Sequence, residues 1–363
     1  MPANATLNIS AVRLLPYLLA PRLDSHPKKS LTLYPHEWTT GLPRITASFG
    51  GRMGNDIPVA KTETQTAGDV TIDVSWIVTE DNVDIAVSRI RPMKPDSGGI
   101  PVVLVHGTYS KRNFWVSPKG IGMATYLAEA GFDVWIPELR GHGLSPKGDR
   151  FSKITAEEQI RYDLPAVQQY VHRITGARQS WVGHSFGGVY ILCALSAKWL
   201  DQGIMRHLFT FGSQISRGES FLKIPGVAWV CSKIIEGIGY FPAPRLGLGP
   251  EIEAAAATVE MISWKKFLGK WTNSEGFCYW DGMEGIRIPF SAFAGAADKS
   301  DPAEGCRILY DSLGSPDKTF TILGKKRGFL KDYDHTGMIV SKEAQEEIWP
   351  MVLGLLESHM NTS

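Results

Sequence analysis

The sequence contains few cysteines, almost no net charge and no long hydrophobic segment. Its 363 residues include four cysteines and no C-x-x-C pair, which argues against a disulfide framework and a cysteine-based metal site. We therefore interpret the cysteines as mostly buried thiols. Lys and Arg number 38 against 37 Asp and Glu, so the net charge of +1 offers no electrostatic basis for binding nucleic acid. We expect no metal, no cofactor and no nucleic-acid partner.

The N-terminal residues lack the features of a signal peptide or a membrane span. The first basic residue is Arg13, and the apolar stretch 14–20 is interrupted by Pro16 and is far too short to cross a bilayer. The sequence therefore predicts a cytoplasmic protein. Segment 12–20 (VRLLPYLLA) has two interpretations, a helix packed on the protein's own surface or a peripheral membrane contact, and we favour the first.

The order of apolar segments predicts a mostly parallel sheet with helices on both faces. Residues 1–68 show little periodicity and are interpreted as an N-terminal extension, whereas 70–78 and 83–90 alternate apolar and polar residues, as a β-hairpin does. From residue 101 onward, buried strands alternate with helices. The expected strands are 101–107, 132–138, 180–184, 207–213, 288–295 and 319–323, and the expected helices are 122–130, 155–176, 187–200, 302–313 and 342–359.

One long segment interrupts this alternation. Residues 216–286 are too long for a plain loop, so we expect a helical cap inserted between two late strands. The predicted core therefore has two parts, residues 69–215 and 287–363. The segment contains four of the chain's tryptophans, namely Trp229, Trp264, Trp271 and Trp280.

A Gly-x-Ser-x-Gly motif identifies a candidate nucleophile. Ser185 lies in WVGHSFGGVY, between an expected strand and an expected helix, which is the setting of a nucleophile elbow. Gly183 and Gly187 suit a turn too tight for a Cβ. We therefore predict that Ser185 is the nucleophile.

A serine hydroxyl is a weak nucleophile, so it requires a base and an acid that orients the base. In this architecture the base follows the last core strand, which leaves His335 and His359; we predict His335, because His359 lies near the end of the final helix. Asp298 directly follows the strand 288–295 and is the predicted acid, with Asp301 as the alternative. The order Ser, Asp, His is that of the α/β hydrolases.

Two backbone N–H groups are expected to form an oxyanion hole. Phe186 follows the nucleophile at the start of a helix and supplies one N–H group. The loop after the strand 101–107 supplies the other, and we assign it to Thr108. His106 in the same loop is interpreted as a structural hydrogen-bonding residue.

The chain resembles the acid-lipase branch of the α/β hydrolases, the gastric and lysosomal acid lipases and their bacterial relatives. The resemblance is carried in order by VTEDNVDIAVSRI, PVVLVHGTYSKRNFWV, LAEAGFDVWIPELRGHGLS, YDLPAVQQYVHRITG and VGHSFGG. It implies hydrolysis of carboxylic esters of apolar acids beneath a cap. The chain differs in having Phe186 where those lipases usually have Gln, and Thr336-Gly337 where they usually have Asp-Phe.

The sequence thus predicts a serine esterase that acts on small esters with an apolar acyl group through an acyl-enzyme. Two alternatives remain: a thioesterase or acyltransferase with the same triad, and a hydrolase-fold binding module without catalysis. The natural substrate, its acyl length and the oligomeric state do not follow from the sequence.

Overall fold

The computed structural model describes residues 57–91, 99–217, 220–266 and 269–359. The predicted N-terminal extension and its apolar segment 12–20 lie outside these residues, apart from 57–68. Among the described residues, no helix is long and apolar enough to cross a membrane.

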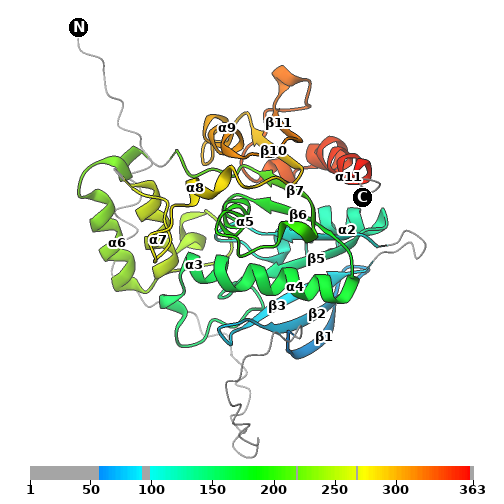
Figure 1. The fold of residues 1–363 in the computed structure, drawn as a ribbon, viewed down its shortest axis with the longest axis horizontal. Coiled ribbons are helices and arrows are strands. Elements are labelled where there is room, and N and C mark those ends of the chain that lie inside the picture. The colour runs from blue at the N-terminus through cyan, green and yellow to red at the C-terminus, as the bar shows by residue number, and fades with distance from the viewer. Residues whose placement is uncertain (1–56, 92–98, 218–219, 267–268, 360–363) are drawn as a thin grey trace, which may run out of the picture. The chain divides into compact units, whose positions relative to one another are not determined.

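A nine-stranded sheet in the order β1-β2-β3-β5-β4-β6-β7-β10-β11 organises the described residues (Figure 1). The pairs β1–β2, β2–β3 and β3–β5 are antiparallel. All later pairs in this order, from β5–β4 to β10–β11, are parallel. The strands are β1 (Val59–Ala67), β2 (Val70–Val78), β3 (Asp84–Ile90), β4 (Pro101–Val105), β5 (Asp133–Glu138), β6 (Gln179–His184), β7 (Met205–Phe211), β10 (Phe290–Gly295) and β11 (Lys318–Leu323). The expected mostly parallel sheet is therefore present.

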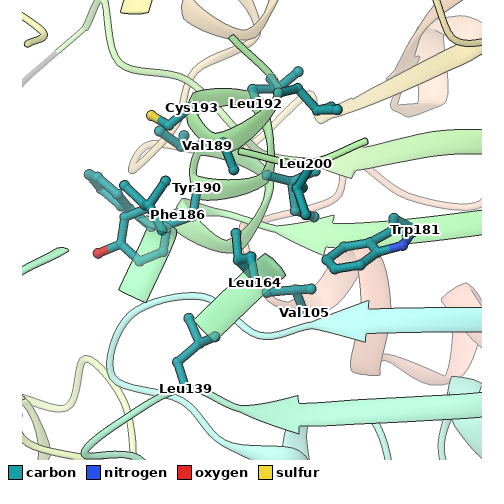
Figure 2. Packing of buried hydrophobic residues seen from close by; sticks show 14 of the residues in the cluster. Val105, Leu139, Leu164, Trp181, Phe186, Val189, Tyr190, Leu192, Cys193 and Leu200 are labelled. Atoms are coloured by element: carbon teal, nitrogen blue, oxygen red, sulfur yellow. The ribbon is translucent and has the colours of Figure 1, made fainter. Parts of the chain in front are cut away.

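Helices cover both faces of this sheet because its central strands are apolar on both sides. Val103 and Val105 of β4 belong to one buried cluster, with α4 and α5, and Val102 and Leu104 to another, with α2 and α11. Figure 2 shows residues of the first cluster, among them Val105 of β4, Trp181 of β6 and Val189 of α5. The core helices are α2 (Met123–Glu129), α3 (Ala156–Glu158), α4 (Leu164–Thr175), α5 (Phe186–Ser196), α9 (Ala303–Ser312), α10 (Gly337–Val340) and α11 (Trp349–Ser358).

The expected helix 155–176 is present but is not one uniform helix. It begins at Thr155, whose side chain and that of Glu158 form the expected capping box, and it ends at Gly176 in the left-handed conformation. A π-helical turn, Gln159–Asp163, separates α3 from α4. Pro165 lies two residues after that turn and has no N–H to donate into it, which accounts for the irregularity expected there.

The sheet begins earlier than the predicted boundary at residue 69. Val59–Ala67, which we assigned to the N-terminal extension, forms β1 and pairs antiparallel with β2. β1 is an edge strand whose side chains are mostly exposed, so it has neither the buried run nor the apolar alternation that reveals a strand in the sequence.

The segment between β7 and β10, which we call the cap, contains helices and a short sheet. It contains α6 (Val227–Ile238), α7 (Ala255–Lys265), α8 (Tyr279–Met283) and the two-stranded sheet β8 (Tyr240–Phe241) and β9 (Glu253–Ala254). Trp264 and Trp271 are buried and contact Tyr279, whereas Trp229 on α6 is 66% exposed. The first two tryptophans therefore pack inside the cap and also belong to the buried cluster that contains α4 and α5.

Candidate active site

Ser185 lies in a sharp turn between β6 and α5. Its backbone has φ 55° and ψ −129°, a conformation that residues other than glycine rarely adopt. A Cβ on Gly187 would lie 2.4 Å from the carbonyl oxygen of His106, and one on Gly183 would lie 2.4 Å from the Cα of Gly188. Both positions therefore require glycine. This strand–turn–helix geometry is that of a nucleophile elbow.

His335 and Asp298 are joined by a hydrogen bond at the carboxyl edge of the same sheet. Asp298 follows β10, His335 follows the neighbouring strand β11, and His335 Nδ1 donates to Asp298 Oδ2 at 2.8 Å. The other carboxylate oxygen of Asp298 accepts the backbone N–H groups of Ser300 and Asp301 at 3.0 and 2.9 Å. With both oxygens engaged, the carboxylate can hold the imidazole ring in one orientation.

Several neighbours determine the charge state of His335. Burial lowers its pKa, but the hydrogen bond to Asp298 and the charges of Asp301 and Asp298 outweigh burial, so the pKa is raised above 6.5. His184, directly before the candidate nucleophile, donates from Nε2 to the carbonyl oxygen of His335 at 2.8 Å. Burial and the nearby His335 lower the pKa of His184 well below 6.5, so His184 stays neutral and acts on the position of the His335 loop.

Asp301 lies on the other side of the His335 ring from Asp298. The Ser185 hydroxyl donates to Asp301 Oδ2 over a long 3.3 Å, and the same oxygen is 3.7 Å from His335 Nε2. Asp298 thus contacts Nδ1 while Asp301 faces Nε2, although both were candidates for the acid. Catalytic hydrogen bonds in a ligand-free site often shorten only when substrate is bound.

The two expected oxyanion donors lie on segments that meet at Ser185. Phe186 is the first residue of α5, and the N–H groups of a first helical turn have no partner within the helix. Thr108 belongs to the loop after β4, which packs against the elbow through His106. His106 accepts the Leu139 N–H at Nε2 and donates from Nδ1 to Gly107, contacts that fit a structural role. Burial and His142 lower its pKa to about 3.

Three further side chains at the site did not stand out in the sequence. They are His184, Gln214 and Lys265. Gln214 follows β7 and donates to Asp301 Oδ1 at 2.6 Å, and Lys265 at the end of α7 lies 3.6 Å from that oxygen. A lysine and a glutamine outside any motif carry no signal of this kind, because the fold alone brings them to Ser185. His184 is part of the motif, but the sequence does not reveal that its side chain contacts the backbone of His335.

In the described part of the chain, no group of three His, Cys, Asp or Glu side chains is arranged to hold a metal ion. A cavity of about 880 Å³ lies between α3 and α7, lined by residues that include Glu157, Arg161 and Glu260. Ser185 and His335 do not line it. This cavity is therefore separate from the candidate active site, which is identified by the geometry around Ser185.

Comparisons with known proteins identify the fold of the chain. The family model described as alpha/beta hydrolase fold matches residues 100–220. The monoacylglycerol lipase of Paleococcus ferrophilus superposes with a TM-score of 0.54 at 18% identity, over 76% of this chain and 99% of that one. A thermophilic esterase of Thermogutta terrifontis gives a TM-score of 0.51 at 19% identity, over 83% and 100%. The chain has the α/β-hydrolase fold.

Within this fold the chain is similar to the acid lipases, as expected. The tear acid lipase-like protein of Mesocricetus auratus is 35% identical over 132 residues, 33% of each chain. Human gastric triacylglycerol lipase is 37% identical over 125 residues, and human lysosomal acid lipase/cholesteryl ester hydrolase is 36% identical over 124 residues. The matched part spans 31% of the length of each of these two human lipases.

Proposed function

We propose that the protein is a serine hydrolase that cleaves carboxylic esters of apolar acids through a covalent acyl-enzyme. The observation that carries the proposal is that the strained Ser185 elbow and the His335–Asp298 pair lie at the same edge of the sheet. In that pair, His335 Nδ1 and Asp298 Oδ2 are 2.8 Å apart. The similarity to lipases and esterases supports ester hydrolysis as the reaction class.

Each residue has a separate role in the proposed reaction. Ser185 Oγ attacks the carbonyl carbon while His335 Nε2 takes the hydroxyl proton, and Asp298 stabilises the resulting imidazolium. The N–H groups of Thr108 and Phe186 stabilise the oxyanion. His335 then protonates the departing alkoxide, leaving the acyl group on Ser185. Water, deprotonated by His335, releases the acid and restores the hydroxyl.

The raised pKa of His335 gives the proposed mechanism a defined pH dependence. Only the neutral imidazole accepts the Ser185 proton, so hydrolysis increases with pH through that pKa, above 6.5. The expected profile of kcat/KM has one acid limb from this ionisation. The profile is measured with p-nitrophenyl butyrate.

A fluorophosphonate probe tests the proposal directly, because it labels activated serines. The wild type should be labelled and Ser185→Ala should not, with ester hydrolysis in the variant reduced by about 10⁴-fold or more. Circular dichroism of the variant establishes that it is folded. A folded Ser185→Ala protein that retains most activity would refute the assignment, and an unlabelled, inactive wild type would favour a binding module.

A further inference from the structure

Asp301 is held beside the reacting atoms by contacts that Asp298 does not share. Asp301 is 4% exposed, and its backbone N–H donates to Asp298 Oδ1 at 2.9 Å. His335 Nδ1 is already bonded to Asp298 Oδ2. Gln214 Nε2 then fixes Asp301 Oδ1 at 2.6 Å, which leaves Oδ2 facing Ser185 Oγ and His335 Nε2.

Lys265 brings a positive charge to the same place from the cap. It is the last residue of α7, and its side chain is 15% exposed. Its ammonium group lies 3.6 Å from Asp301 Oδ1 and 4.7 Å from the centre of the Phe186 ring. One half of this ion pair therefore comes from a core loop and the other from the cap.

We propose that Asp301 and Lys265 form a charge pair that sets the ionisation of His335 and holds the Ser185 hydroxyl in the resting site. Asp301 touches the nucleophile and lies next to the nitrogen that receives its proton, so it stabilises the imidazolium from the Nε2 side. Lys265 is a positioning residue that acts through Asp301, because its positive charge partly offsets the effect of the Asp301 carboxylate on His335. This inference rests on the proposed function.

Other titratable groups near His335 also act on its pKa, beside the Asp301–Lys265 pair. Asp298 faces Nδ1 from the loop after β10, and His184 of β6 lies with its ring centre 4.6 Å away. His184 is kept neutral by burial and by His335. Among the charges that act on the pKa of His335, Asp301 raises it and Lys265 lowers it. The two members of the pair should therefore shift that ionisation in opposite directions.

The test compares pH profiles of kcat/KM for p-nitrophenyl butyrate in the full-length protein. Asp301→Asn removes a negative charge and should move the acid limb down by about one pH unit. Lys265→Met should move the limb up, by about half a unit because the lysine faces Asp301 Oδ1 and not the oxygen next to the ring. The double variant should lie between the two single variants.

Matched controls separate this effect from loss of charge in general. Asp311→Asn on α9 and Lys233→Met on α6 remove exposed charges that pair with Arg307 and Glu236. Both should keep the wild-type limb. A merely structural Asp301–Lys265 pair would lower activity or stability and leave the limb in place, an outcome that overturns the inference.

A second readout covers the case in which Asp301→Asn does not fold. Lys265→Met changes only the partially exposed member of the pair, and the rate of fluorophosphonate labelling reports the same ionisation without an acyl substrate. An unchanged limb in Lys265→Met refutes the inference even then. Failure of the proposed function gives a different result. A folded Ser185→Ala protein would then retain most activity, or the wild type would be neither labelled nor active.

Discussion

The core and the cap contribute to the site in different ways. In the core, Ser185 and Asp298 closely follow strands β6 and β10, and His335 lies in the loop after β11, where His184 of β6 bonds to its backbone. The cap contacts the core through buried apolar side chains, such as Met261 beside Tyr190, and through charged ones, such as Lys265 beside Asp301 and Glu251 bonded to core lysines. Substitutions in the core should therefore change the chemistry, and substitutions in the cap should change substrate range, ionisation and stability.

The largest effect is expected at the histidine of the core. His335→Ala removes the base and should lower kcat by about 10⁴-fold, because the members of such a catalytic unit act together. His359→Ala is the matched control: His359 ends α11 and contacts Asp317 at 3.2 Å. It should stay within about twofold of wild type, as checked by p-nitrophenyl butyrate hydrolysis. An inactive His359→Ala protein with an active His335→Ala protein would reverse the assignment.

A glycine without reactive atoms should have the next largest effect on the core chemistry. Gly212 has φ 56°, and a Cβ there would lie 3.0 Å from Asp298 Oδ2 and 3.1 Å from His335 Nδ1. Gly212→Ala should therefore disturb the pair and lower kcat by about 10–100-fold, since a misplacement of about 1 Å is costly in catalysis.

Gly176→Ala is the control for backbone strain alone. Gly176 has φ 64°, but a Cβ there would meet nothing within 4 Å. Both variants should lose about 1–2 kcal/mol of stability from the left-handed backbone, and only Gly212→Ala should lose activity. Equal activities at equal Tm would show that the His335–Asp298 geometry tolerates the extra methyl group.

The strands and helices of the core were predictable because each carries its own local signal. β4, β5, β6 and β10 are buried along their whole length, and such continuous apolar runs are visible in the sequence. The edge strand β1 was missed because its side chains are mostly exposed.

For the candidate site, the sequence identified residues at strand ends but not the contacts between them. Ser185, Asp298 and His335 stand at positions that the topology brings to one edge. The sequence could not tell which oxygen of which aspartate meets which ring nitrogen, since that depends on a turn in which Asp298 accepts the Asp301 N–H. Lys265 could not be predicted for a different reason. Its place beside the site depends on the folding of the cap, which brings its ammonium group over the Phe186 ring.

The cap should affect the choice of acyl group to a smaller extent. Phe186 and Tyr190 of α5 form an apolar surface with Met261 of α7, and Tyr109 stacks on Phe241 at 5.2 Å. We predict that kcat/KM increases from acetyl to medium-chain p-nitrophenyl esters by up to about fourfold per buried methylene, or about 0.8 kcal/mol. A charged acyl group such as succinyl should be a poor substrate.

A pair of cap variants tests where the acyl selectivity arises. Phe241→Ala should flatten the increase with chain length, whereas Leu248→Ala, at a 55% exposed position of the same cap, should not. Activity that is equal from acetyl to octanoyl esters in the wild type would contradict a role of these apolar side chains in binding the acyl group.

The smallest effect is expected where the cap meets the core through a buried histidine. His142 Nε2 lies 3.1 Å from Glu253 Oε2 of β9, and both side chains are almost fully buried. Burial lowers the pKa of His142, but the charge and hydrogen bond of Glu253 outweigh burial, so the pKa is raised above 6.5. The contribution of this pair is therefore complete below pH 6.5 and is lost as the pH rises through the raised pKa.

Glu253→Gln keeps a hydrogen-bond acceptor at this joint and removes the charge. The variant should be less stable than wild type at low pH by about 1 kcal/mol, the difference between a charged and a neutral hydrogen bond. In a protein of this size that corresponds to about 2 °C in Tm, and the gap should close as His142 loses its proton. Thermal unfolding of both proteins across pH measures the gap. A gap that stays constant with pH would show that His142 is not the group that titrates at this contact between cap and core.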